Sequence, residues 1–236
     1  MTISEQLRTL YTHCRETGLP VDPHVAAVAI RAAGDYAGTR ANYVSVITTA
    51  MVEYMRGYQG MVASRNVFKK AMVTAFGDAF DTGFMETSGG DTYDPEPEDN
   101  QYLAVRMEQE LAYIDSLFFS LKEIMSGATI EEPVTDADIV SEADSRAVGY
   151  SRTLDSIYGQ GKLRGRKNIM LSLEGESGEE SSSTCQKYLH VRHRAKWWVA
   201  HNLIPGPGSE TYECRGYRCL HFLADSDGNQ WAGSLE

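Results

Sequence analysis

An apolar stripe between residues 103 and 125 constrains the fold of this chain more than any other feature of its sequence. Successive members of the stripe are separated by 4, 4, 3, 4, 3 and 4 positions: Leu103, Met107, Leu111, Ile114, Phe118, Leu121 and Met125. In an α-helix this spacing places every member on one face. Because a helix with one apolar face has to bury that face against a partner, the stripe predicts a long helix inside a larger helical body.

Three further segments repeat the helical period, at residues 44–58, 68–84 and 139–157. The second of them is rich in phenylalanine at helical spacing, which favours core packing over a stacking surface for bases or a cofactor. Shorter patterns before residue 38 predict N-terminal helices. The sequence therefore predicts a mainly α fold.

Two stretches interrupt or replace the helical period. Residues 87–100 are rich in Gly, Asp, Glu and Pro and predict an acidic loop. Beyond residue 165, short apolar runs at 168–173 and 219–223 predict strands, with a turn at 225–228. We therefore expect three parts: N-terminal helices over residues 1–38, a multi-helix body over 39–165 that includes the acidic loop 87–100, and a small, loop-rich α+β Cys/His module over 166–236.

Gly159, Gly161 and Gly165 follow the last helical pattern and superficially resemble a phosphate-binding loop. Such a loop needs a strand before its glycines and a helix after them, because the N-terminus of the helix faces the phosphate. Here a helix precedes the glycines and a strand follows. We therefore predict that they end the helix and form a hinge.

The net charge of −11 is concentrated in the front of the chain, since residues 1–140 contain 21 acidic and 10 basic residues whereas 141–236 contain 12 of each. No part has the strongly basic character of a dedicated DNA-binding domain. No apolar run is long enough to span a membrane, and the first residues lack the features of a signal peptide, so we expect a soluble, non-exported protein without membrane contact. A solvated or partner-facing surface is predicted for the basic residues of the second half: Arg164, Arg166, Lys167, Lys187, Arg192, Arg194 and Lys196.

Three of the four cysteines lie between residues 184 and 223, together with several histidines. In a non-exported protein they are expected to be reduced, which favours metal binding or burial over a disulfide framework. Zinc needs thiolate or imidazole donors that converge tetrahedrally, and a structural site uses four of them. One structural zinc ion is therefore predicted, with buried thiols or a late disulfide as the alternatives. Its predicted ligands are Cys185, Cys214, Cys219 and His221.

Two other functions are compatible with these residues. In a thiol hydrolase, Cys185 would be the nucleophile and a nearby His190, His193 or His201 the base that lowers the thiol pKa. No local signature of such an enzyme surrounds them, so we predict that the chain is not an enzyme. A zinc-stabilised nucleic-acid-binding module is the other alternative, and the acidic total charge disfavours it.

The order of residues in this stretch resembles a known module. In sequence they are Cys185, the pair Trp197 and Trp198, Pro205 and Pro207, and then Cys214, Cys219 and His221. A similar order is found in the C-terminal module of the tailed-phage head-morphogenesis proteins, the Mu F-like minor head proteins. That module commonly contains C-x-x-C, a tryptophan, a proline turn and C-x-x-x-x-C-x-C. Tyr188 stands at the position of its second cysteine, and His221 at the position of its last.

The resemblance extends over residues 40–225 and implies a function. It implies a minor head protein, a portal- or capsid-associated structural component that acts in head morphogenesis rather than in chemistry. The expected partners are the portal protein, the major capsid protein or both, and a weak contact with packaged DNA is left open. The expected location is the head or neck region of the virion, after assembly in the host cytoplasm.

Overall fold

The computed structural model describes residues 34–89, 93–127, 133–175, 183–207 and 219–233, together with residues 209 and 211–213 and scattered positions between 9 and 30. Most of the N-terminal helices predicted for residues 1–38 lie outside the described residues. Residues 176–182 lie there as well, as does Cys214. All statements that follow concern the described part of the chain.

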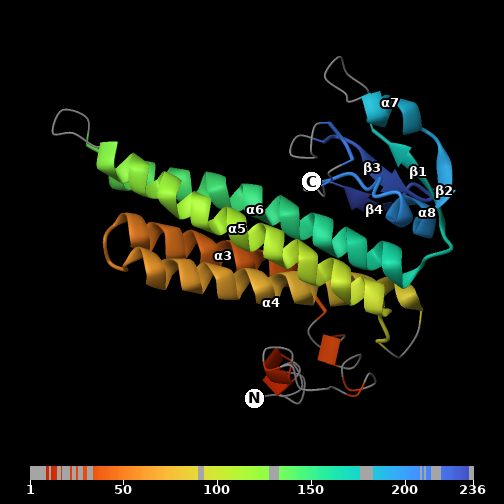
Figure 1. The fold of residues 1–236 in the computed structure, drawn as a ribbon, viewed down its shortest axis with the longest axis horizontal. Helices are drawn as coiled ribbons and strands as arrows, with labels where there is room; N and C mark the ends of the chain where they lie inside the picture. Colours follow the sequence, from red (N-terminus) through yellow and green to blue (C-terminus); the bar gives the residue numbers. More distant parts are fainter. Residues whose placement is uncertain are drawn as a thin grey trace.

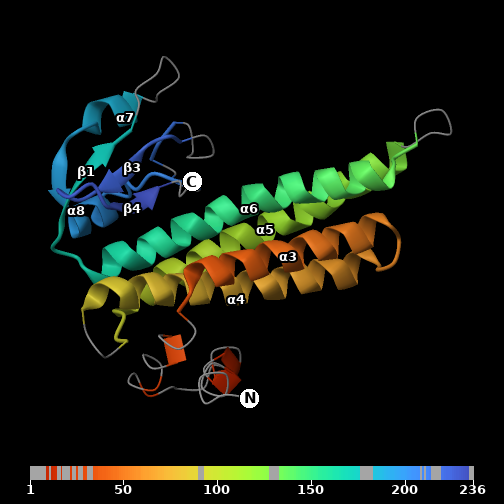
Figure 2. The ribbon, with the colours of Figure 1, turned by 180° about the vertical axis from the view of Figure 1, so that it is seen from behind.

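Four long helices form the body of the molecule. They run side by side along its longest dimension (Figures 1 and 2) and have the bounds α3 Tyr36–Met55, α4 Met61–Ser88, α5 Pro97–Gly127 and α6 Asp136–Gly165. A small antiparallel sheet follows at the C-terminal end of the chain. The prediction of a mainly α fold with a small C-terminal α+β module is therefore confirmed. None of the helices in this described part combines the length and the apolar character that a membrane span needs.

Aromatic side chains fill the centre of the body, as the spacing of the phenylalanines predicts. Phe68, Phe76 and Phe80 of α4 are completely buried. The Tyr43 ring of α3 meets Phe68 and Phe76 edge-on, with ring centroids 6.5 and 6.3 Å apart. Aromatic pairs prefer this geometry, so these contacts stabilise the bundle beyond the burial of apolar area.

Local signals fix where α5 and α6 begin. Pro97 opens α5 at a position where the missing N–H costs nothing, and the carboxylates of Glu98 and Asp99 follow in its first turn. Thr135 caps α6 in a capping box with Asp138. The predicted acidic loop 87–100 is consequently too long at both ends, because α4 continues to Ser88 and α5 begins at Pro97.

The predicted helix end and hinge is wrong for Gly159 and Gly161, because α6 continues through both residues, whereas Gly165 is indeed the last residue of α6. A β-carbon at position 165 would lie 2.4 Å from the carbonyl oxygen of Phe84 in α4, and one at position 159 would lie 2.9 Å from the Cα of Ala232. These glycines let α6 approach other backbones closely. Gly159 and Gly161 are therefore packing positions inside α6, and Gly165 is a packing position at its last residue.

The C-terminal module combines four short strands with two short helices. The strands have the order β2-β1-β3-β4 and all pairs are antiparallel. The elements are β1 Met170–Glu174, α7 Ser183–Tyr188, β2 Arg192–Arg194, α8 Ala195–Ala200, β3 Phe222–Ala224 and β4 Gln230–Gly233. The strand predicted at 219–223 thus begins later, and residues 219–221 form the segment that leads into β3. The predicted turn after β3 is present, with Gly228 at a φ of 82°.

The module packs against one end of the bundle, on α6 (Figure 1). Its own core surrounds Trp198, which is completely buried and donates a hydrogen bond from its indole Nε1 to the Leu171 carbonyl oxygen at 3.2 Å. Leu163 of α6 belongs to the same core. Helix and module therefore share apolar surface.

Candidate metal centre

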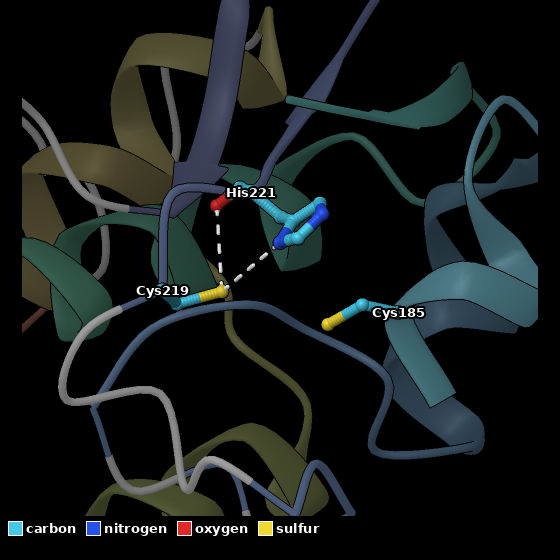
Figure 3. A group of neighbouring side chains, drawn as sticks. All are labelled: Cys185, Cys219 and His221. Carbon is cyan, nitrogen blue, oxygen red and sulfur yellow. Dashed lines mark hydrogen bonds between the residues drawn. The ribbon is translucent and has the colours of Figure 1, made fainter. Parts of the chain in front are cut away.

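Three side chains of the module bring potential metal ligands together. Cys185 comes from α7, while Cys219 and His221 come from the segment that leads into β3 (Figure 3). One ligand atom from each residue lies within 4.8 Å of the other two, and all three residues are buried. Two thiols and an imidazole are donors that zinc prefers.

The distance between two of these ligand atoms is close to the value expected in a zinc site. The Cys219 Sγ atom and the His221 Nδ1 atom are 3.8 Å apart. In a tetrahedral zinc site, with Zn–S near 2.3 Å and Zn–N near 2.0 Å, sulfur and nitrogen ligands would be about 3.5 Å apart. Figure 3 shows both sulfur atoms on the side of the His221 ring that carries Nδ1. The described residues could therefore hold a metal ion between them.

The state of His221 suits metal binding. Burial lowers the pKa of its imidazole, which favours the neutral form that coordinates metals. Its Nε2 atom is buried and has no hydrogen-bond partner among the described residues. A buried ring nitrogen without a partner is costly, so hydrogen bonding through Nε2 among the described residues does not explain the position of this histidine.

The backbone places His221 at the site through a close contact with the end of β1. Gly175 has a φ of 132°, and a β-carbon there would lie 2.9 Å from the His221 Cα and 3.2 Å from its Cδ2 atom. Only glycine fits these two constraints without strain. On the other side, Leu223 of β3 pairs with Leu173 of β1, which fixes the register of the segment that carries the ligands.

Cys185 is held by the short helix α7. The Glu213 carboxylate accepts hydrogen bonds from the hydroxyl groups of Ser183 and Thr184, at 2.5 and 3.2 Å. The backbone after the helix returns to the sheet, where Leu189 bridges Leu173 of β1. The helix therefore presents Cys185 to the interior, where its exposure is 1%.

His190, His193, His201 and Tyr188 make contacts outside the candidate metal centre. His190 pairs with Glu174 at 2.8 Å, while His193 and His201 stack on Trp197 with ring centroids 3.6 and 4.1 Å apart. Tyr188 packs against Trp197 as well. His221, rather than any of the three histidines considered as a base, is the one grouped with Cys185. Of the four predicted ligands, Cys214 lies outside the described residues.

Two of the basic residues near the module have partners that the sequence did not reveal. Arg164 forms an ion pair with Asp99 at 2.9 Å, and Lys167 forms one with Glu96 at 2.7 Å. Both carboxylates come from the start of α5 or the loop before it. Part of the predicted partner-facing basic surface is thus neutralised inside the molecule.

Comparison with known proteins gives no relative. No protein-family model matches the chain, and no curated protein and no solved structure shows significant similarity to it. The similarity to the Mu F-like minor head proteins therefore stays a prediction that rests on the sequence motifs.

Proposed function

We propose that this chain is a minor head protein of a tailed phage, a portal- or capsid-associated structural component that acts in head morphogenesis. The buried group of Cys185, Cys219 and His221 carries this proposal. Three positions that the motif resemblance pairs with ligand positions of the family's module lie together in the fold. Cys219 and His221 are close in sequence, whereas Cys185 is brought to them by the fold.

We further propose that the centre binds one structural zinc ion, with Cys214 as the predicted fourth ligand. The three described ligands are at most 6% exposed. A catalytic zinc keeps an open position for water or substrate, whereas a structural zinc is closed by protein ligands. Burial therefore supports a structural role, in which the ion joins α7 to the segment before β3.

The long body would supply the contact with other head proteins. Large apolar side chains are exposed on it, among them Phe119 and Tyr113 of α5 at 58% and 51% exposure. Exposed aromatic side chains are typical anchors of protein interfaces. The partners would be the portal protein, the major capsid protein or both, within the head or neck of a virion assembled in the host cytoplasm.

The two alternative functions have less support. A thiol hydrolase needs a nucleophile that substrate can reach, and Cys185 is only 1% exposed. A nucleic-acid-binding module needs unpaired cations, and Arg164 and Lys167 are both paired with carboxylates. A weak contact with packaged DNA through the other basic residues is compatible with the proposed function.

The test is assembly with the neighbouring head proteins. The purified chain is mixed with the portal and major capsid proteins encoded beside it, and complexes are measured by size-exclusion chromatography. We expect a complex with one of them, weakened by Phe119→Ser but not by Val62→Ser, a change at a comparably exposed side chain of α4. Binding to neither protein, together with absence from particles and assembly intermediates, would contradict the proposal.

A further inference from the structure

Several basic side chains at the end of α6 and in the module form no ion pair within the part of the chain that the structure describes. They are all exposed: Arg166, Lys187, Arg192, Arg194 and Lys196. In the bundle, by contrast, Arg56 pairs with Asp136 at 2.7 Å and Arg146 with Glu142 at 2.8 Å. Residues 183–207 contain no acidic residue. Unpaired positive charge is therefore concentrated in the module of a chain whose net charge is −11.

Four of these residues are neighbours in the fold and form a basic row: Arg166, Lys196, Arg194 and Arg192. β2 is the edge strand of the sheet, and Arg192 and Arg194 share one of its faces because they are two positions apart. The backbone N–H of Lys196 donates to the Lys167 carbonyl oxygen at 2.9 Å, which holds the start of α8 against the connection that begins at Arg166. Figure 1 shows β2 and this connection on the outer side of the module, at the right of the view. The row therefore follows an outer edge of the molecule.

The side chains opposite the two arginines on β1 carry no charge. Met170 pairs with Arg194, and Ser172 pairs with Arg192. Glu174, the acidic residue of β1, already has a histidine partner at 2.8 Å. The guanidinium groups of the row are therefore available to a partner outside the chain.

The acidic residues of the bundle weaken an attraction to this edge only in part. The bundle is long, since α6 alone has 30 residues and extends about 45 Å. Exposed charges farther apart than the Debye length, about 10 Å at 0.1 M ionic strength, are largely screened from one another. A charged partner at the basic row is consequently affected mainly by the charges of the module.

We propose that the basic row binds the phosphate backbone of duplex DNA without reading its base sequence. Arginine presents a planar fork of donors that matches a phosphate group, and several adjacent cations match a polyanion. The proposed function allows a weak contact with packaged DNA, and the basic row gives that contact a defined surface. The source of the DNA rests on the proposed function, whereas the charges of the row do not depend on it.

The aromatic side chains beside the basic row favour a duplex over a single strand. Proteins that bind single strands stack the bases on open faces of aromatic rings. His193 and His201 both stack on Trp197, with ring centroids 3.6 and 4.1 Å away, and two rings at these distances have to lie on opposite faces. Both faces of this tryptophan are therefore occupied. A duplex, whose bases are stacked on one another, needs only backbone contacts.

The short edge strand disfavours an acidic peptide as the partner. β2 has only 3 residues, and charged side chains on an edge strand discourage the addition of another strand. Protein interfaces are usually centred on several apolar or aromatic anchors. On β1, the strand pairing places one exposed large apolar side chain, Met170, beside Arg194. One such side chain gives a protein partner little to bury.

The test is binding of the full chain to fluorescent DNA, measured by anisotropy over a series of salt concentrations. For a duplex of mixed sequence we expect a Kd on the order of 10⁻⁵ M near 0.1 M salt, and the same Kd for a second, unrelated sequence. Release of counterions from the contacted phosphates should give the plot of log K against log salt a slope of about −3. A single strand of the same length and polyglutamate should both bind more weakly. Failure to bind the duplex, a slope near zero, or equal or tighter binding of either competitor would overturn the proposal.

Substitutions connect the binding to the basic row. Lys196→Gln and Lys122→Gln remove the same charge from two exposed lysines, and Lys122 lies on α5, outside the row. Lys196→Gln should weaken duplex binding about eightfold at 0.1 M salt and reduce the slope by about 0.9, because one phosphate contact is lost. Lys122→Gln should leave both unchanged. The double change of Arg192→Gln and Arg194→Gln should reduce the slope by about 1.8.

Thermal unfolding by circular dichroism checks that the variants fold, and if the double variant does not, the matched lysine pair decides. Equal effects of Lys196→Gln and Lys122→Gln would overturn the basic row as the binding surface. A chain that binds the portal or capsid protein but not duplex DNA would overturn this proposal alone. Binding of duplex DNA without either protein partner would count against the proposed function alone.

Discussion

Gly161 of α6 lies against the backbone of Phe80 in α4 so closely that a β-carbon at position 161 would be 2.2 Å from the Phe80 carbonyl oxygen. The contact is reciprocal along the two helices, because a β-carbon on Gly83 of α4 would lie 2.3 Å from the Tyr158 carbonyl oxygen of α6. The absence of side chains at these positions lets the helices approach more closely than ordinary side chains allow. This pair of helices forms the central contact of the body.

Gly161→Ala is therefore expected to destabilise the protein by about 3 kcal/mol, because the added methyl group forces two helix backbones apart. Chemical denaturation followed by circular dichroism measures the change. Gly149→Ala is the matched control, since Gly149 lies in the same helix, is exposed, and has nothing within 4 Å of an added β-carbon. It should stabilise the protein by about 0.5–1 kcal/mol through helix propensity. A Gly161→Ala variant as stable as wild type would contradict the close packing.

The glycines of α6 also show why the sequence wrongly predicted a hinge in this helix. A cluster of Gly159, Gly161 and Gly165 breaks the local helical propensity, and a local pattern cannot reveal that a second helix compensates for it. The compensation comes from Phe80 and Phe84, far away in sequence. The apolar periods of the helices, in contrast, are local signals, so the mainly α fold could be predicted.

In the candidate site, too, the local features could be predicted from the sequence and the contacts between distant residues could not. The short spacing of Cys219 and His221 could be recognised in the sequence, and the order of the motif residues predicted Cys185 as a further ligand. The ion pair of Arg164 with Asp99 could not be predicted, because the two residues are 65 positions apart. Pairings of this kind depend on how the helices pack, and they decide which cations remain available to a ligand.

The N-terminus of α6 depends on Thr135. The backbone N–H of Asp138 donates to the Thr135 hydroxyl at 3.2 Å, and the backbone N–H of Thr135 donates to the Asp138 carboxylate at 2.9 Å. Thr135→Ala removes the first bond and should cost about 1 kcal/mol of unfolding free energy in denaturant titrations. Thr135→Ser keeps the hydroxyl and should retain most of this stability. Equal losses in both variants would mean that the methyl group, and not the cap, is responsible.

Asp81 predicts a pH dependence of stability. It is fully buried in α4, accepts a hydrogen bond from the Tyr93 hydroxyl, and burial raises the pKa of its carboxyl to about 8. Between its unfolded value of about 4 and this folded value, the folded state holds a proton that the unfolded state releases. The stability contribution is thus complete below about pH 4 and is lost as the pH rises through about 8.

Asp81→Asn should remove this slope. The amide keeps the shape of the protonated carboxyl and still accepts from Tyr93, but it does not titrate. In denaturation series between about pH 5 and pH 8, wild type should lose about 1 kcal/mol per pH unit more than the variant. Asp144→Asn, at an exposed position of α6, should leave the slope of wild type unchanged. Parallel curves for wild type and Asp81→Asn would show that Asp81 is ionised in the folded protein.

Metal removal tests the Cys/His centre. Protein purified without chelators from zinc-containing medium should contain about one zinc ion per chain by elemental analysis, as a closed tetrahedral site requires. A strong chelator should lower the Tm and expose the module to proteolysis, since the binding energy of a structural zinc is folding energy. Zinc affinity should also fall on acidification, because the thiols have to lose their protons to bind.

Substitutions then identify the ligands. Cys219→Ser and His221→Ala should each abolish stoichiometric zinc, whereas Cys14→Ser, at the cysteine outside the C-terminal module, should retain it. Cys214→Ser tests the predicted fourth ligand: loss of zinc supports Cys214, and full retention assigns the fourth position to another group. Protein that contains no zinc after such a purification, and whose Tm is unchanged by added zinc, would leave Cys185, Cys219 and His221 as a buried cluster whose role is packing alone.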